Sequence, residues 1–139
     1  PGYWPPTPTG RFEDVPMGHW AAGWIEQLVN DGISEGCDET HFCPDQLVSR
    51  AEIASMLGKA KYWPMPFEPS EASGDQFLDV GSEFWAADWI EELASIGVVE
   101  GCKVGRYCPE EAVSRAELAV FLVKTFNIPL QNVESFTSE

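Results

Sequence analysis

The sequence predicts an all-α protein made of two tandem helix–loop–helix repeats that are joined by Pro-rich extended connectors. Three observations predict this class: much of the chain matches itself after a shift of 65 residues, apolar residues recur at helical spacing, and one helix-capping motif occurs twice. Each repeat also contains two cysteines, for which we expect a local disulfide.

The internal match runs without a gap over some fifty positions, which indicates a duplicated unit. The matched segments are 12–15 with 77–80, 20–26 with 85–91, 35–37 with 100–102, 43–44 with 108–109, and 48–52 with 113–117. We therefore expect each structural feature of the first repeat to have a counterpart 65 residues later.

The first helix of each repeat is predicted from an apolar stripe. In the first repeat the stripe consists of Trp20, Trp24, Ile25 and Leu28, which lie at i, i+4, i+5 and i+8. Gly32 is expected to end this helix, and Gly97 is expected to end its counterpart.

The second helix of each repeat is predicted from a capping box. Ser49 with Glu52, and Ser114 with Glu117, have the spacing in which the serine caps the helix and the glutamate binds back to the cap. Apolar runs follow both boxes, at 53–57 and 118–122. The sequence therefore predicts four helices in all.

Proline-rich segments flank the repeats and suggest semi-rigid extended connectors. We expect a connector at 1–11, a first repeat at 12–61, a linker at 62–76, a second repeat at 77–126, and a tail at 127–139 that starts a further connector. Because the chain opens at Pro1 and both ends resemble connectors, we read it as a processed or excised part of a longer series.

The cysteines form two pairs, each with five residues between its members: Cys37 with Cys43, and Cys102 with Cys108. An even count that is duplicated with the repeat favours two disulfides and an oxidising compartment. Closing so short a loop stabilises the fold by roughly 2 kcal/mol. A zinc site is the alternative, but its usual spacing is different and His41 has no histidine counterpart.

The composition excludes several classes of function. A formal net charge of −15 and the lack of a basic cluster argue against nucleic acid and anionic membranes as partners. No apolar run is long enough to span a bilayer. No nucleophile–base pair, phosphate loop or nucleotide motif is present, so we expect no enzyme, no catalytic residue and no cofactor. Calcium bridging of the acidic surface is left open, without an EF-hand-like loop to support it.

The repeated motifs together resemble the S-layer homology family. The first repeat supplies its F-x-D-V, H-W-A, G-I-x-x-G, F-x-P and T-R-A-E-like elements at 12–15, 19–21, 32–36, 42–44 and 49–52. The second repeat supplies similar elements at 77–80, 85–86, 97–101, 107–109 and 114–117, with Phe84, Val98 and Tyr107 in place of the histidine, isoleucine and phenylalanine. In both repeats serine replaces the threonine of T-R-A-E, which keeps the capping chemistry.

The resemblance implies a bacterial cell-surface role. Family members commonly arrange three repeats as a pseudo-threefold bundle and anchor exported proteins to cell-wall polysaccharide through grooves between repeats. The motif arginine contributes to that contact, which maps onto Arg50 and Arg115. The cysteines and the strong negative charge depart from what a binder of anionic wall polymer would show.

Each candidate contact has a structural alternative. Arg50 and Arg115 lie in a first helical turn, where the dipole disfavours a cation, so a carboxylate partner competes with a glycan. We expect Trp20 and Trp85 in the core. The remaining candidates for glycan or interface contacts are Trp4, Trp63, Trp24 and Trp89.

We therefore expect an extracellular, non-enzymatic structural protein of the cell envelope. Its repeats would self-assemble into a surface layer, sheath or filament with copies of the chain or with other repeats of this kind. The alternative is a glycan-binding anchoring module processed from a larger surface protein, with envelope polysaccharide as its partner.

Overall fold

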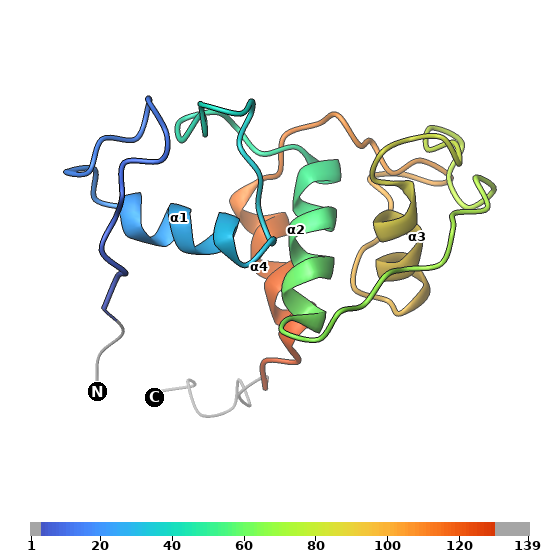
Figure 1. Cartoon of the computed structure of the whole chain (residues 1–139). Helices are drawn as coiled ribbons and strands as arrows, with labels where there is room; N and C mark the ends of the chain where they lie inside the picture. Colours follow the sequence, from blue (N-terminus) through green and yellow to red (C-terminus); the bar gives the residue numbers. More distant parts are fainter. Residues whose placement is uncertain (1–3, 130–139) are drawn as a thin grey trace, which may run out of the picture.

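The computed structural model describes residues 4–129, and the helices lie in two pairs along the chain (Figure 1). They are α1 (Ala22–Asn30), α2 (Arg50–Tyr62), α3 (Ala87–Ser95) and α4 (Arg115–Phe126). No strand occurs within the described range, where pairing is limited to isolated bridges. The predicted all-α class is confirmed.

Both predicted capping boxes are present. The Ser49 hydroxyl accepts from the Glu52 amide at 3.1 Å, while the Ser49 amide donates to the Glu52 carboxylate at 2.7 Å. The copy at α4 has the same two bonds at 3.1 and 3.0 Å. These bonds satisfy amide groups that the first turn of a helix would leave without partners.

The first helices begin later than the apolar stripe predicts. Because α1 starts at Ala22, Trp20 lies in the preceding turn and its side chain is 85% exposed. Trp85 likewise precedes α3 and is 61% exposed. The prediction that these two tryptophans are core residues is therefore wrong, since neither lies on the buried stripe of its helix.

The α2–α4 pair stands at the centre of the fold, with α1 and α3 on opposite sides of it (Figure 1). The main hydrophobic core joins α2, α3 and α4, and it is centred on fully buried side chains such as Tyr107, Ile90 and Leu93. A smaller core lies under α1 and contains Phe12, Val15, Ala22 and Ile25. The second helix of the first repeat thus packs mainly against the second repeat.

The two disulfides join Cys37 to Cys43 and Cys102 to Cys108, with a Cα–Cα distance of 6.0 Å in each. Both pairings are local to their repeats, as the sequence predicts. Each closes the loop that leads from the first helix of a repeat to the second.

Candidate functional site: an open helix face and an inter-repeat groove

The second repeat covers the start of α2 through backbone hydrogen bonds. The amide of Arg50 donates to the Glu111 carbonyl at 2.8 Å, and the amide of Ala51 donates to the Pro109 carbonyl at 2.9 Å. The Val113 amide donates to the Val48 carbonyl, also at 2.9 Å. The amino terminus of α2 is therefore built into a contact between the repeats.

Arg50 is the centre of this contact and is only 3% exposed. Its guanidinium donates to the carbonyls of Tyr107 at 2.8 Å and Glu100 at 2.7 Å. It also pairs with the Glu117 carboxylate at 3.2 Å and lies 4.6 Å from the centre of the Tyr107 ring. The contacts of this candidate residue are thus made within the chain, and they join the two repeats.

Tyr107 completes the same contact from the other side. Its hydroxyl donates to the Arg50 carbonyl at 2.9 Å. Burial raises the pKa of Tyr107 to about 12, against a smaller lowering by the charge of Arg50. The phenol therefore stays protonated and keeps its donor role at physiological pH.

The face of α4 that corresponds to the buried face of α2 is not covered by any segment within residues 4–129. Ala51, Ala54, Leu57 and Gly58 are buried on α2, whereas Ala116, Ala119 and Leu122 are exposed on α4 and Val123 is half-buried. We call these four residues of α4 the open face. Leu122 is 36% exposed where Leu57 is 5% exposed. Arg115 is exposed at its edge and has no ion-pair partner among residues 4–129.

A groove of about 540 Å³ runs between the first-repeat loop, α2 and the start of α3. Trp85 and Trp89 come from the second repeat, and Lys59 and Met56 come from α2. The other lining residues are Ile33, Ser34, Glu35, Gly36, Cys37, Phe42, Cys43, Pro44, Gln46, Leu47, Val48, Glu52 and Ser55. The groove therefore lies between two adjacent repeats and has aromatic residues in one wall.

The charge of the groove is slightly acidic. Among its described lining residues Lys59 is the one cation, and its amino group lies 3.4 Å from the Glu35 carboxylate. Glu52 adds a further negative charge. Indole faces beside hydrogen-bonding groups suit sugar rings better than they suit a polyanion.

Trp89, which lines the groove, packs closely against α2. Its indole lies over Gly58, where an added Cβ would overlap the ring. Tyr62 and Phe67 stack on each other at 3.8 Å, and the Trp89 ring lies 6.5 and 6.2 Å from them. A glycine in the middle of α2 thus permits this close approach of the second repeat.

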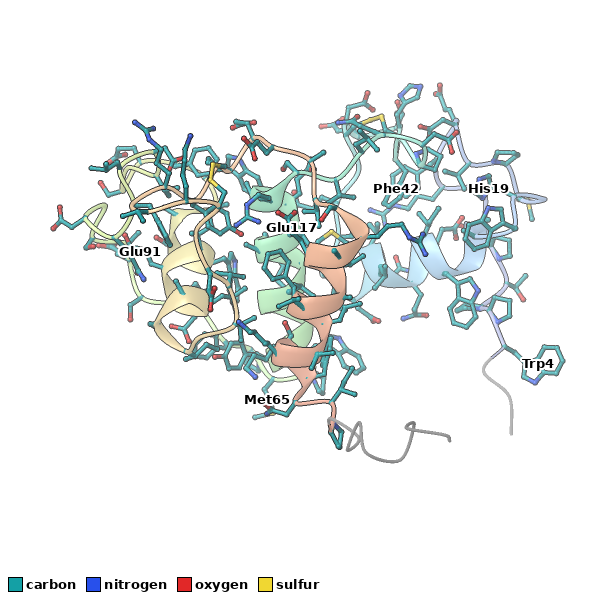
Figure 2. The ribbon with its side chains drawn as sticks, turned by 180° about the vertical axis from the view of Figure 1, so that it is seen from behind. Trp4, His19, Phe42, Met65, Glu91 and Glu117 are labelled. Atoms are coloured by element: carbon teal, nitrogen blue, oxygen red, sulfur yellow. A yellow bond between two sulfur atoms is a disulfide. The ribbon has the colours of Figure 1, made fainter. Side chains whose placement is uncertain are left out.

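The remaining predicted contact residues lie apart from one another. Trp4 is 84% exposed and projects from the amino-terminal connector, away from the body of the protein (Figure 2). Trp63 is 51% exposed at the end of α2, and Trp24 is 38% exposed on α1. Only Trp89 of the four lines the inter-repeat groove.

Two aspartates of the F-x-D-V motifs hold the disulfide loops, a role that the sequence analysis missed. The Asp14 carboxylate accepts from the amides of Phe42 at 2.9 Å and Cys43 at 2.7 Å. Asp79 accepts from Tyr107 and Cys108, both at 2.8 Å. Burial raises the pKa of each carboxyl, but the amide bonds together hold both pKa values below the usual range. The sequence signal that could have indicated this role is that an aspartate occurs at the same position in both repeats.

Two glutamates bind the connectors through hydrogen bonds, a role that the sequence did not reveal either. Glu26 on α1 accepts from the amides of Thr9, Gly10 and Arg11 at 2.8 to 3.1 Å. Glu91 on α3 accepts from the next connector in the same way, at 2.8 Å from the amides of residues 73 and 74. The connectors are therefore bound along the first helices.

One cluster within residues 4–129 has metal-ligand chemistry: Cys102, Cys108 and Glu111. Its two sulfurs are joined in a disulfide and so provide no thiolates for zinc. No helix in the described range has the length and apolar character needed to cross a membrane.

The family comparison agrees with the motifs. Residues 11–54 match the model of the S-layer homology domain. The second repeat has the same helix order, capping box, disulfide loop and aspartate anchor. Residues 11–54 are therefore an S-layer homology domain, as the sequence predicts, and the second repeat shares its architecture.

Its relatives are long proteins of which it resembles a small part. It is 32% identical over 117 residues to the S-layer protein EA1 of Bacillus anthracis, a match to 84% of this chain and 13% of that protein. Cell surface glycoprotein 1 of Acetivibrio thermocellus is 30% identical over 76% of this chain and 5% of its own length. The cellulosome-anchoring protein of the same organism is 28% identical over 76% of this chain and 24% of its own length.

Proposed function

We propose that the chain is a non-catalytic structural module of the cell surface, which assembles by docking a further S-layer homology repeat on the open face of α4. The observation that supports this is the contrast between two copies of one helix. The face of α2 is buried by the next repeat, and the corresponding face of α4 is exposed.

The charges of the open face suggest how such a repeat would bind. In the chain itself, Arg50 of one repeat pairs with Glu117 of the next. A repeat docked on α4 would place its own motif glutamate beside Arg115, as Glu117 lies beside Arg50. Burial of Leu122 and its neighbours would add the apolar contribution.

An extended chain tests this function. Residues 1–129 are followed directly by a further copy of residues 65–129, because Pro129 corresponds to Pro64 in the repeat register. The added copy carries Trp89→Ala, because a tryptophan at this position would meet Val123 on α4, where α2 has Gly58. We expect hydrogen exchange of the α4 amides to slow by about tenfold relative to the unextended chain.

Two matched variants of the second repeat sharpen this test. Leu122→Glu places a charge on the open face and should abolish the protection, whereas Val104→Glu makes the same change at a fully exposed loop position and should not. Unchanged α4 exchange in the extended chain would contradict the proposal. So would equal protection of α4 by residues 130–139 alone, since the tail would then be the occupant.

The inter-repeat groove supports a second candidate function, the binding of an envelope glycan. Trp85 is 61% exposed and lines the groove together with Trp89 and Lys59. An exposed indole can stack on a sugar ring while an amino group in the same groove binds a hydroxyl or carboxylate. Attachment of the chain to a wall polysaccharide would then accompany assembly.

Matched tryptophan substitutions test the glycan site. Trp85→Ala should weaken binding of purified cell-wall polysaccharide by about tenfold in a titration calorimeter, as expected for the loss of one stacking contact. Trp20→Ala removes the corresponding exposed tryptophan of the first repeat, which does not line the groove, and should leave binding unchanged. Equal effects of the two substitutions would argue against this site.

A further inference from the structure

The fit between the two repeats depends on one small residue that α4 lacks. On α2 the Trp89 indole lies directly over Gly58, where even a single Cβ would overlap the ring. The residue at the same position of α4 is Val123, which has a Cβ and two methyl groups. A repeat that docked on α4 in the same geometry would bring its own residue at the Trp89 position against this valine.

The neighbouring positions differ in the same sense. Tyr62, whose ring lies 6.5 Å from that of Trp89, corresponds to Asn127 after α4. Ser55 corresponds to Val120, which is 49% exposed. The end of α4 therefore lacks both the gap and the tyrosine that receive an indole on α2, and it presents branched aliphatic side chains instead.

The anchor for the start of a docking repeat is nevertheless retained. Arg115, Ala116 and Ala119 repeat Arg50, Ala51 and Ala54 without change. Ala51 and Ala54 are 1% and 0% exposed beneath the second repeat. The two helices thus share the part of the face that any repeat would use and differ where the tryptophan lies.

We propose that Val123 makes the open face of α4 selective for an S-layer homology repeat with a small residue, in place of tryptophan, at the position of Trp24 and Trp89. The inference rests on the proposed docking of a repeat at α4 and specifies which repeat fits. Both repeats of this chain carry the tryptophan, so a copy of the chain docks less well than a different repeat. The face therefore favours assembly with unlike repeats over copies of itself.

The extended chain separates this inference from the proposed function. With Trp89 restored in the added copy, we expect most of the α4 protection from hydrogen exchange to be lost. Val123→Gly should restore it, because the gap found at Gly58 is then recreated on α4. Val120→Gly is the matched control, since it weakens the same helix equally without opening that position.

Each outcome decides between the two proposals. Protection of α4 that requires either Trp89→Ala in the added copy or Val123→Gly on α4 supports the proposed selectivity of Val123. Protection that is equal for the alanine and tryptophan versions overturns the selection but leaves docking at α4 intact. If neither version protects α4 and Val123→Gly does not change this, the docking proposal fails, and the inference fails with it.

Discussion

The helices α2 and α4 begin with the same Ser-Arg-Ala-Glu motif and the same capping box, yet their surroundings are opposite. Arg50 is buried and bound to three groups of the second repeat, whereas the corresponding Arg115 is exposed. The difference lies in the surface that covers each helix. The second repeat thus completes the second helix of the first repeat. On the proposed docking, a further repeat would complete α4 in the same way.

The largest expected difference in stability is between substitutions of the two motif arginines. Arg50→Ala should lower the free energy of unfolding by about 3 kcal/mol, because it leaves two carbonyls and the Glu117 carboxylate without their buried partner. Arg115→Ala should change it by less than about 0.5 kcal/mol. Urea denaturation followed by tryptophan fluorescence measures both. Equal losses would show that the two helices are not differently covered.

The next effect is at Gly58 and Val123. Gly58→Ala should cost about 2 kcal/mol, because the added methyl overlaps the Trp89 ring and overrides the better helix propensity of alanine. Val123→Ala should remain within about 0.5 kcal/mol of the natural chain. In a chain that already carries Trp89→Ala, Gly58→Ala should cost little stability, because the ring that it would overlap is absent. An undiminished loss in that background would contradict the proposed clash.

Acid should affect the two repeats alike, because their loops share the aspartate anchor. The folded pKa values of Asp14 and Asp79 are lowered, so their contribution is present above the ordinary aspartate pKa of 3.8 and is lost as the pH falls through the lowered values. Asp14→Asn and Asp79→Asn should each flatten the acid limb of the stability profile. An effect from only one of them would show that the loops differ as the helices do.

The smallest effect is expected at His41, whose counterpart in the second repeat is Arg106. The hydrogen bond with Asp38 raises the pKa of His41 above 6.5, so its contribution is present below that pH and is lost as the pH rises through the raised value. His41→Arg should remove this dependence between about pH 6 and pH 8, since arginine stays charged. Chemical denaturation at the two pH values measures it. A dependence that survives His41→Arg would assign it to another group.

Local sequence was sufficient for the helices and disulfides because their determinants are short-range. A serine and glutamate three residues apart determine a capping box, and two cysteines in one loop pair where the loop brings them together. The same reasoning placed Trp20 in the core, because a periodic stripe shows which face of a helix is apolar but leaves the first turn uncertain. The start of α1 at Ala22 leaves that tryptophan exposed.

The sequence by itself determined the duplication, the all-α class, the four helices and the two disulfide loops. It also supplied the candidate arginines, but one motif at two positions offers no reason for one to be buried and the other exposed. Only the tertiary structure decided that, because burial depends on which surface the next repeat covers. The second repeat lies on α2 and provides Arg50 with its partners, while among residues 4–129 nothing does the same for Arg115.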